Sequence, residues 1–139
     1  MDCEMCETAE GPALARATAV DRYGNVLYDE LVLPELPITD YLTRFSGITA
    51  AMLEGVTRRV EHVQEALLKL VSHKTWVIGH GLENDLKALR IVHARALDTA
   101  LLYTHPKGLP HKPALRVLTH RLLGRQIQDG SHDSAADAK

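Results

Sequence analysis

The strongest limit on the fold comes from two strand-like stretches joined by a short turn. Residues 14–21 and 26–33 are rich in apolar side chains, and the turn between them contains Gly24 and Asn25, residue types that accept positive φ. Residues 1–5 have the character of the end of a further strand. We therefore expect three consecutive strands at the start of the chain.

Beyond Pro34 the pattern changes to alternating strands and helices. Apolar residues at helical spacing predict a helix over 59–72. Short strands are expected at 75–78, as a buried strand, and at 96–98. Between them the turn Gly79-His80-Gly81 leads into a helix whose apolar side carries Leu82, Leu86, Leu89 and Val92. Shorter helices are expected at 40–45, at 50–54 with Thr49 as N-cap, along Leu115, Leu118 and Leu122 after Pro113, and from Asp133 or Ser134 onward. A strand meander followed by this alternation predicts an α/β domain.

Size and composition are those of one ordinary domain. The chain has 139 residues, of which 45% are hydrophobic, which is enough for a packed core. No apolar run approaches the ~20 residues that a membrane helix needs. We therefore expect a soluble intracellular protein without a membrane partner.

The two cysteines, Cys3 and Cys6, have the spacing of a zinc-binding or redox pair. A zinc site needs a second pair of ligands at matching spacing, and the sequence contains none. We expect Cys3 to point into the core, opposite to Asp2 and Glu4, and Cys6 to have no specific role. Both thiols should be reduced, without zinc or a disulfide.

Acidic side chains in the first strand indicate a metal site. Alternate residues of a strand share a face, so Asp2 and Glu4 present two carboxylates to one side. Asp85 and Asp137 lie near the starts of predicted helices, where they could also simply favour the helix dipole. Together, four carboxylates in one crevice would repel one another without cations, and hard oxygen ligands suit Mg²⁺ or Mn²⁺. His132, one histidine among eight, could then serve as a base beside two ions or be an ordinary surface or core residue.

Charge is unevenly distributed along the chain, although the formal net charge is only −2. Residues 1–10 contain acids and no Lys or Arg, whereas residues 99–128 contain five Lys or Arg and no acid. The basic stretch could follow a nucleic-acid backbone, or it could be an ordinary solvated helix face. Charge alone favours neither interpretation.

Three motifs give the chain a recognisable signature. They are Asp2-Cys3-Glu4-Met5, the segment Gly79-His80-Gly81-Leu82-Glu83-Asn84-Asp85, and His132-Asp133-Ser134-Ala135-Ala136-Asp137. The segments 44–49 and 97–99 are two further parts of this signature. With these motifs the chain resembles the DEDDh 3′→5′ exonucleases of the RNase H-like superfamily, and it is most similar to eukaryotic RNA exonucleases that trim the 3′ ends of structured RNAs.

The resemblance implies a mixed central sheet flanked by helices, and a role for each motif residue. Asp2 would bridge two Mg²⁺ or Mn²⁺ ions, Glu4 and Asp137 would complete the first site, and Asp85 would hold the second ion. His132 would be the general base. Met5, Phe45 and Leu82 would line the pocket for the 3′-terminal nucleotide, with plain core packing as the alternative. It further implies an RNA partner, with single-stranded DNA as a second option, no small-molecule cofactor, and a nuclear or nucleolar location.

The sequence departs from the family at its ends and in the third motif. It begins one residue before the first motif and ends two residues after Asp137, so we expect a single domain, residues 1–139, that is truncated at both ends. Ala136 stands where relatives often carry Glu. Three functions stay open: a metal-dependent 3′→5′ exoribonuclease releasing nucleoside 5′-monophosphates, a weak or inactive RNA-binding module of the same fold, and a DNA exonuclease. The complete motif set favours the first.

Overall fold

Four antiparallel strands form the main sheet of the computed structural model, which describes residues 1–108, 110–128 and 133–139. The spatial order is β3-β2-β1-β4, and two further short strands, β5 and β6, pair in parallel. The strands are β1 (Asp2–Thr8), β2 (Gly11–Val20), β3 (Val26–Leu31), β4 (Ile38–Asp40), β5 (Val77–Gly79) and β6 (Ala96–Asp98). The predicted meander is confirmed, because β1 pairs with β2 and β2 pairs with β3.

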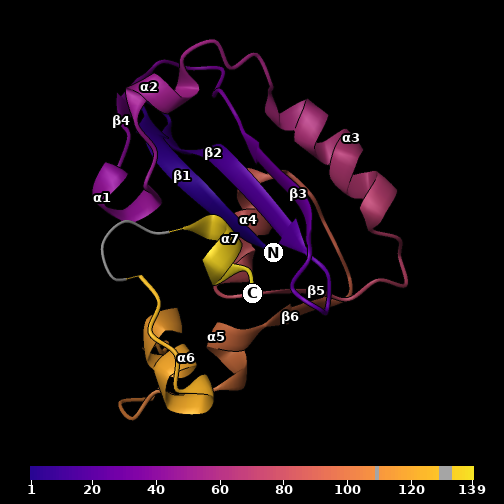
Figure 1. Ribbon diagram of the computed structural model, residues 1–139, viewed down its shortest axis with the longest axis vertical. Helices are drawn as coiled ribbons and strands as arrows, with labels where there is room; N and C mark the ends of the chain where they lie inside the picture. The colour runs from indigo at the N-terminus through magenta and orange to yellow at the C-terminus, as the bar shows by residue number, and fades with distance from the viewer. Residues whose placement is uncertain (109, 129–132) are drawn as a thin grey trace.

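Seven helices in the described residues surround these strands (Figure 1). They are α1 (Thr43–Ser46), α2 (Ala50–Leu53), α3 (Val60–Leu70), α4 (Leu82–Ala88), α5 (Thr99–Leu102), α6 (Leu115–Leu123) and α7 (Ser134–Asp137). The N-cap predicted for α2 is present, since the Thr49 hydroxyl accepts a hydrogen bond from the backbone N–H of Met52. Among the described residues, no helix is both long and apolar enough to cross a bilayer.

Side chains of β1 alternate between two apolar clusters. Cys3 is buried with Leu14, Val32 and Leu67 in the cluster to which α3 contributes. Cys6 is fully buried on the other side of the strand, against Ile48 and the start of the segment that carries α2. Both cysteines are free thiols. The core position expected for Cys3 is confirmed, but the expectation that Cys6 has no role was wrong, because Cys6 is a core residue of the second cluster.

The expectations for residues 40–45 and 75–78 were only partly confirmed. The short helix expected at 40–45 is present as α1, but it begins at Thr43, because β4 ends at Asp40 and pairs with the end of β1. Residues 75–78 were expected to form a buried strand, yet Trp76 is 58% and Ile78 is 50% exposed. An apolar run of four residues does not reveal how many of its sides are covered, and strand pairing between distant segments is not visible in local pattern.

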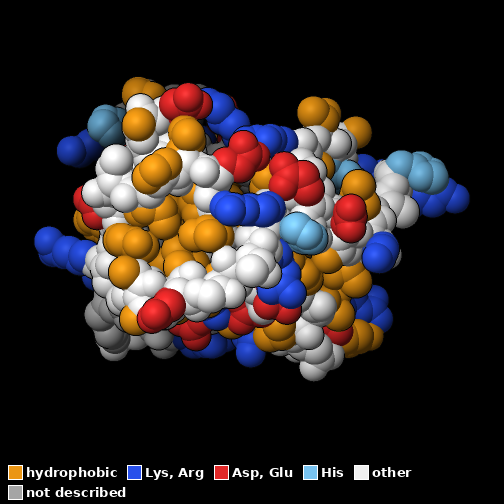
Figure 2. Space-filling model, turned by 90° about the horizontal axis from the view of Figure 1, so that it is seen from above, with side chains coloured by type: hydrophobic (Ala, Val, Ile, Leu, Met, Phe, Trp, Pro, Cys, Tyr) orange, Lys and Arg blue, Asp and Glu red, His pale blue; other side chains and the backbone are white. Residues whose placement is uncertain are grey.

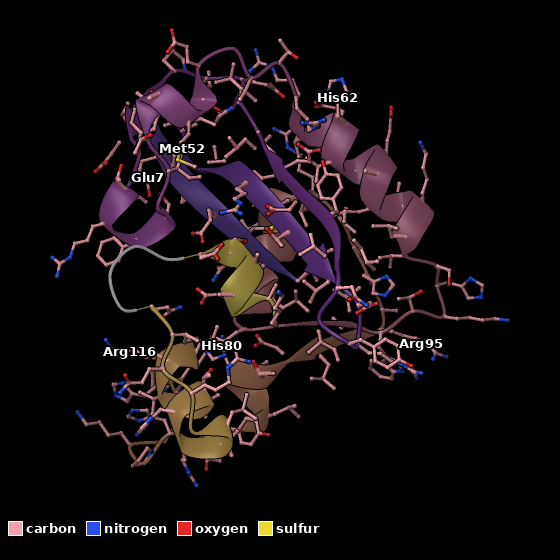
Figure 3. The ribbon with its side chains drawn as sticks, in the orientation of Figure 1. Glu7, Met52, His62, His80, Arg95 and Arg116 are labelled. Atoms are coloured by element: carbon pink, nitrogen blue, oxygen red, sulfur yellow. The ribbon has the colours of Figure 1, made fainter. Side chains whose placement is uncertain are left out.

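The helix after Gly81 is shorter than its apolar pattern suggests. It ends at Ala88, and Arg90 then adopts a positive φ of 54°, so Val92 lies outside the helix and is fully exposed. Similarly, α6 buries Leu118 but leaves Leu122 half exposed. Arg116 lies on the outer side of α6 (Figure 3). Its charged side chain is therefore exposed to solvent at this end of the molecule.

The opposite end of the molecule, around α2 and α3, carries charges of both signs. Figure 2 looks onto this end and shows Lys and Arg side chains interspersed with Asp and Glu, beside an apolar area. Two ion pairs from this region are Arg58 with Glu30 at 2.8 Å and Arg90 with Glu61 at 3.9 Å. Positive and negative side chains are therefore mixed on this face.

A partly buried ion pair joins β2 to β3. The Arg16 guanidinium donates to both Asp29 carboxylate oxygens, from Nε at 2.7 Å and from Nη2 at 2.8 Å, and the Thr18 hydroxyl donates to Oδ1 at 2.9 Å. The Arg16 hydrogen bonds hold the pKa of Asp29 below its usual value. Both side chains are about one quarter exposed, at 21% and 26%. The pair should therefore stabilise the sheet more than an exposed pair would.

Asp29→Asn is expected to lower the free energy of unfolding at pH 7 by about 1–3 kcal/mol, because it leaves a charged donor without its charged acceptor. A depressed carboxylate pKa adds stability above the unfolded-state value of 3.8 and loses it as pH falls through the folded value. The difference from the unsubstituted protein should therefore shrink below pH 4. Urea unfolding at both pH values measures it, with the exposed Glu10→Gln as control. A constant difference across this range would contradict the assignment.

Candidate active site

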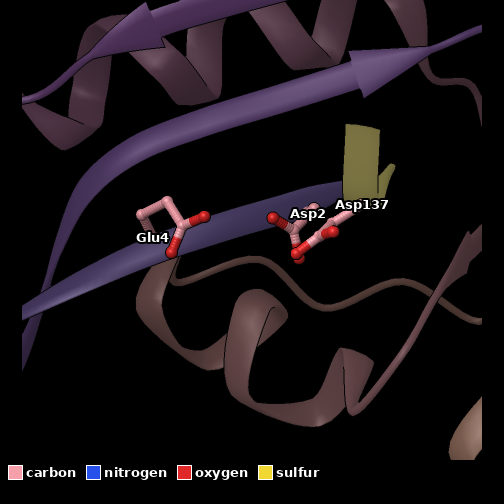
Figure 4. Close-up of side chains that lie close together, drawn as sticks. All are labelled: Asp2, Glu4 and Asp137. Carbon is pink, nitrogen blue, oxygen red and sulfur yellow. The ribbon is translucent and has the colours of Figure 1, made fainter. Parts of the chain in front are cut away.

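Three carboxylates converge at the start of β1. Asp2 and Glu4 project from one face of the strand, and Asp137 approaches them from α7 (Figure 4). One carboxylate oxygen from each lies within 4.8 Å of those of the other two. The alternation of strand side chains thus brings together the pair predicted from the first motif, and α7 adds the acid predicted from the third.

Helix α7 is held against the sheet by polar contacts on both sides. Its N-cap Asp133 accepts from the Ala135 N–H at 3.2 Å and lies 3.6 Å from the Arg16 guanidinium. Ser134 is fully buried and donates to the backbone carbonyl of Asp2 at 3.4 Å. The Gln128 amide donates to Oδ2 of Asp137 at 2.7 Å. These contacts place Asp137 opposite β1.

A β-bulge in β2 brings Arg16 beside the carboxylates. Glu4 pairs with Arg16 whereas Met5 pairs with Leu14, so Ala15 is an extra residue in the ladder. Bulges re-aim side chains and are common next to active sites. The Arg16 charge lowers the pKa of Glu4 and so opposes part of the effect of burial.

Asp85 belongs to the same electrostatic environment, although it is not one of the three carboxylates that converge. It is buried in α4, whose N-cap Gly81 has the left-handed φ of 69°. The Asp98 carboxylate fixes this turn by accepting from the N–H groups of Gly81 and Ala100, each at 2.8 Å. The negative charge of Asp85 raises the pKa of both Asp2 and Glu4.

The partly buried Asp2 and the buried Glu4 and Asp85 are poorly solvated as anions. Burial is the largest cause of a pKa raised to about 7 for Asp2, about 8 for Glu4 and about 6 for Asp85. Repulsion by Asp85 and Asp137 adds to the shift of Asp2, and repulsion by Asp2 and Asp137 adds to that of Glu4. Within the described part of the chain, the buried Oε1 of Glu4 has no hydrogen-bond partner.

Such a donor set fits a divalent cation. A cation would supply the partner for Glu4 Oε1 and neutralise charges that otherwise repel one another. The ligands are carboxylate oxygens without a thiol or imidazole in the group, which suits hard ions such as Mg²⁺ and Mn²⁺. The chemistry of the residues therefore supports a metal centre at this point of β1.

The predicted pocket residues occupy different environments. Leu82 is only 1% exposed, and Met5 is partly buried against the cluster around Cys3. Phe45 is 60% exposed, with the Arg44 guanidinium 5.8 Å from its ring centroid. Phe45 thus has a ring surface accessible for stacking, whereas Met5 and Leu82 have core contacts. His132 lies outside the described residues.

Several residues that support the site were missed by the sequence argument. Arg16 is the only charged residue in β2, and that isolated charge in an apolar strand was an available signal. Ser134 stands inside the third motif, beside the acids, but a serine at this point of a predicted helix start has no pattern that would indicate its contact with β1. Asp98 was noted only as part of a matching segment, and its carboxylate now has a defined function in holding the turn before α4.

A family model described as Exonuclease, of the RNase T type, matches residues 1–139. The chain belongs to the exonuclease family. Among curated proteins it is 45% identical to RNA exonuclease 1 of Saccharomyces cerevisiae, over all of this chain and 25% of that protein. It is 42% identical to RNA exonuclease 3 of Schizosaccharomyces pombe, over 99% of this chain and 26% of that protein. The exonuclease chain thus spans about a quarter of the length of the curated relatives it matches.

Solved structures show the same fold. The catalytic unit of Neurospora crassa Pan2 superposes with a TM-score of 0.85 and 30% identity, over 99% of this exonuclease and 24% of that chain. The Pan2 exonuclease module of Saccharomyces cerevisiae in complex with AAGGAA RNA superposes with a TM-score of 0.84 and 30% identity, over 99% and 26% of the two chains. The expected α/β exonuclease fold, with a mixed set of strands and flanking helices, is therefore confirmed.

Proposed function

We propose that this exonuclease is a metal-dependent 3′→5′ exoribonuclease of the DEDDh type that releases nucleoside 5′-monophosphates. The observation that carries the proposal is the convergence of Asp2, Glu4 and Asp137, with oxygens within 4.8 Å of one another and pKa values of Asp2 and Glu4 raised towards neutrality. The RNA exonucleases among its relatives support RNA as the substrate. Trimming of 3′ ends and a nuclear or nucleolar location are part of the same proposal.

Asp2, Glu4 and Asp137 would hold one ion, and Asp2 with Asp85 would hold a second. When bound, a pair of Mg²⁺ or Mn²⁺ ions supplies activation of a water molecule and stabilisation of the charge that develops on the leaving oxygen. The chain's own contribution is to fix the donors. Ser134 and Arg16 anchor α7 and thereby Asp137, while Asp98 holds the turn that precedes Asp85.

The proposed reaction is hydrolysis of the terminal phosphodiester. Water attacks the terminal phosphorus in line with the 3′-oxygen of the preceding nucleotide, and the bond from phosphorus to that oxygen breaks. His132 takes the proton from the attacking water, and the departing 3′-oxygen is protonated by solvent. The phosphate stays on the released nucleotide, and the shortened chain ends in a new 3′-hydroxyl. Phe45 would stack on a terminal base without discriminating between bases.

Two alternatives have less support. An inactive RNA-binding module of this fold would have no reason to retain Asp2, Glu4, Asp85 and Asp137 together. A DNA exonuclease would use the same carboxylates, and the distinction rests on relatives that are named RNA exonucleases. The substrate comparison below separates these possibilities.

The direct test is degradation of 5′-labelled single strands of RNA and DNA with Mg²⁺, with Mn²⁺ and with EDTA. We expect a ladder of products that shorten by one nucleotide, faster on RNA, absent in EDTA, and absent when the 3′ end carries a phosphate. Internal cuts at early times, or equal degradation in EDTA, would overturn the proposal. Faster degradation of DNA would favour the DNA alternative.

Metal binding should also stabilise the fold. A ligand that binds only the native state adds about 2.7 kcal/mol at a hundredfold excess over its dissociation constant, which corresponds to roughly 5–10 °C in the melting temperature of a domain of this size. Thermal unfolding in EDTA and in Mn²⁺ measures the shift. Glu10→Gln, away from the carboxylates, should keep the full shift. Identical midpoints with and without Mn²⁺ would argue strongly against a shared metal centre.

A further inference from the structure

A run of positive charge occupies the segment from the end of α5 through α6. Residues 99–128 contain no Asp or Glu. All their Lys and Arg side chains are exposed, and we call them the basic tract: Lys107, Lys112, Arg116, Arg121 and Arg125. The tract therefore carries five positive charges in a chain whose formal net charge is −2.

The geometry of α6 turns these charges outward. Leu118 is buried, and it holds the inner side of the helix. Arg116 and His120 are four residues apart and therefore share one outer side, and Arg121 is also exposed, about 140° further around the helix from Arg116. Figure 3 shows Arg116 on the side of α6 that faces solvent.

An ordinary solvated helix face would be expected to balance its charges. Among residues 1–108, 110–128 and 133–139, no side chain of the basic tract takes part in an ion pair, whereas Arg16, Arg58 and Arg90 each do. The face around α2 and α3 mixes both signs (Figure 2). The unbalanced charge of α6 is thus a local property of this end of the molecule.

The segment that carries the tract ends at the carboxylates, where the Gln128 amide donates to Oδ2 of Asp137 at 2.7 Å. The His80 ring lies 3.0 Å from the Thr99 hydroxyl and bonds to the backbone of Pro113, in the loop that leads into α6. Burial is the main cause of a lowered pKa for His80, and the charges of Lys112 and Asp137 also act on it. His80 therefore contacts the start of α5, and Figure 3 shows it beside α6.

We propose that the basic tract binds backbone phosphates of the RNA strand upstream of the 3′ end that occupies the carboxylate site. This inference rests on the proposed function. The contacts are to phosphates and carry no sequence preference, so they hold single strands of any sequence. The tract runs from the loop before α6 over the exposed surface of that helix, and it provides affinity that grows with the length of the RNA.

The physical signature of such contacts is salt dependence. Each phosphate contact on a single strand contributes about 0.7 to the slope of log affinity against log salt. Replacing two Arg residues should therefore reduce the slope by about 1.4. Between 50 and 200 mM salt, these two contacts alone would lower the RNA affinity roughly sevenfold.

The experiment compares Arg116→Gln/Arg121→Gln with Lys69→Gln/Lys74→Gln, a control that removes two exposed charges from α3 and the loop after it. Binding of a fluorescent 20-nucleotide RNA is measured in EDTA, where metal-dependent hydrolysis stops, at several salt concentrations. Hydrolysis of a p-nitrophenyl ester of a nucleoside 5′-monophosphate, with metal, reports the carboxylate site alone. The test variant should bind the RNA several-fold more weakly with a smaller salt slope, while the control keeps both values and both variants hydrolyse the ester normally.

The outcomes separate the two proposals. If the test variant bound RNA with the same affinity and salt slope as the unsubstituted protein, the proposal for the basic tract would be wrong and the proposed function would stand. A parallel loss in both variants would also overturn it, because the effect would then come from net charge. Failure of the unsubstituted protein to hydrolyse RNA and the ester, with tight salt-dependent RNA binding retained, would overturn the proposed function alone.

Discussion

Asp2→Asn is expected to lower the rate of 3′-terminal nucleotide release by on the order of 10³-fold or more. Asp2 is the carboxylate that both ions would share, and its loss removes several kcal/mol of charge stabilisation from the transition state. Asparagine keeps the size of the side chain, so the packing of β1 against α7 is preserved. Single-turnover degradation of 5′-labelled RNA in Mn²⁺ measures the effect, with Glu7→Gln on the same strand as control.

The stability of the same variant distinguishes lost chemistry from lost structure. The pKa of Asp2 is raised from 3.8 to about 7, mainly by burial, so the free energy of unfolding of the metal-free protein falls as pH rises between these values. At pH 8 in EDTA, Asp2→Asn should therefore be at least as stable as the unsubstituted protein. A variant that is inactive and also clearly less stable in EDTA would contradict the role given to Asp2.

His132→Ala is expected to lower the rate by about 10²–10⁴-fold, the usual effect of removing a general base. A general base accepts a proton only when it is unprotonated, so the rate of the unsubstituted protein should rise with pH and then level off. The variant should lose this rising limb. Rates between pH 5.5 and 8.5 under saturating Mn²⁺ measure both effects.

Metal binding gives the control for His132. Because the imidazole is not among the carboxylate ligands, Mn²⁺ should raise the melting temperature of His132→Ala as much as that of the unsubstituted protein. His73→Ala, in the exposed loop after α3, should keep both the rate and its pH dependence. Full activity in His132→Ala would refute the assignment.

Local pattern was sufficient to predict the carboxylates of β1. A strand has a period of two, so Asp2 and Glu4 had to share a face once residues 1–5 were assigned to a strand. Cys3 then had to face the core, as observed. Asp137 was found through the spacing of the third motif, and its approach to β1 agrees with that assignment.

The local sequence pattern did not predict contacts between segments that are distant in the chain. Arg16 reaches the site because Ala15 is an extra residue in the pairing of β1 with β2, and a bulge leaves no trace in the hydrophobic pattern. The edge strand β4 depends on the end of β1 as its partner, and its three residues, Ile38–Asp40, are too few for a strand pattern to be recognised. The exposure of Trp76 and Ile78 likewise depends on what packs against them.

The alternation of β1 has a consequence for changes in chain length. Asp2, Glu4 and Cys6 use one side of the strand, and Cys3 and Met5 use the other. One residue inserted after Asp2 would turn Glu4 into the apolar layer and Cys3 towards the carboxylates, so it would damage folding and chemistry together. Two inserted residues would keep each side chain on its own face but move Glu4 about 6–7 Å further from Asp2, which would abolish the chemistry and spare the core. Insertions of odd and even length in this strand should therefore produce two different kinds of inactive protein.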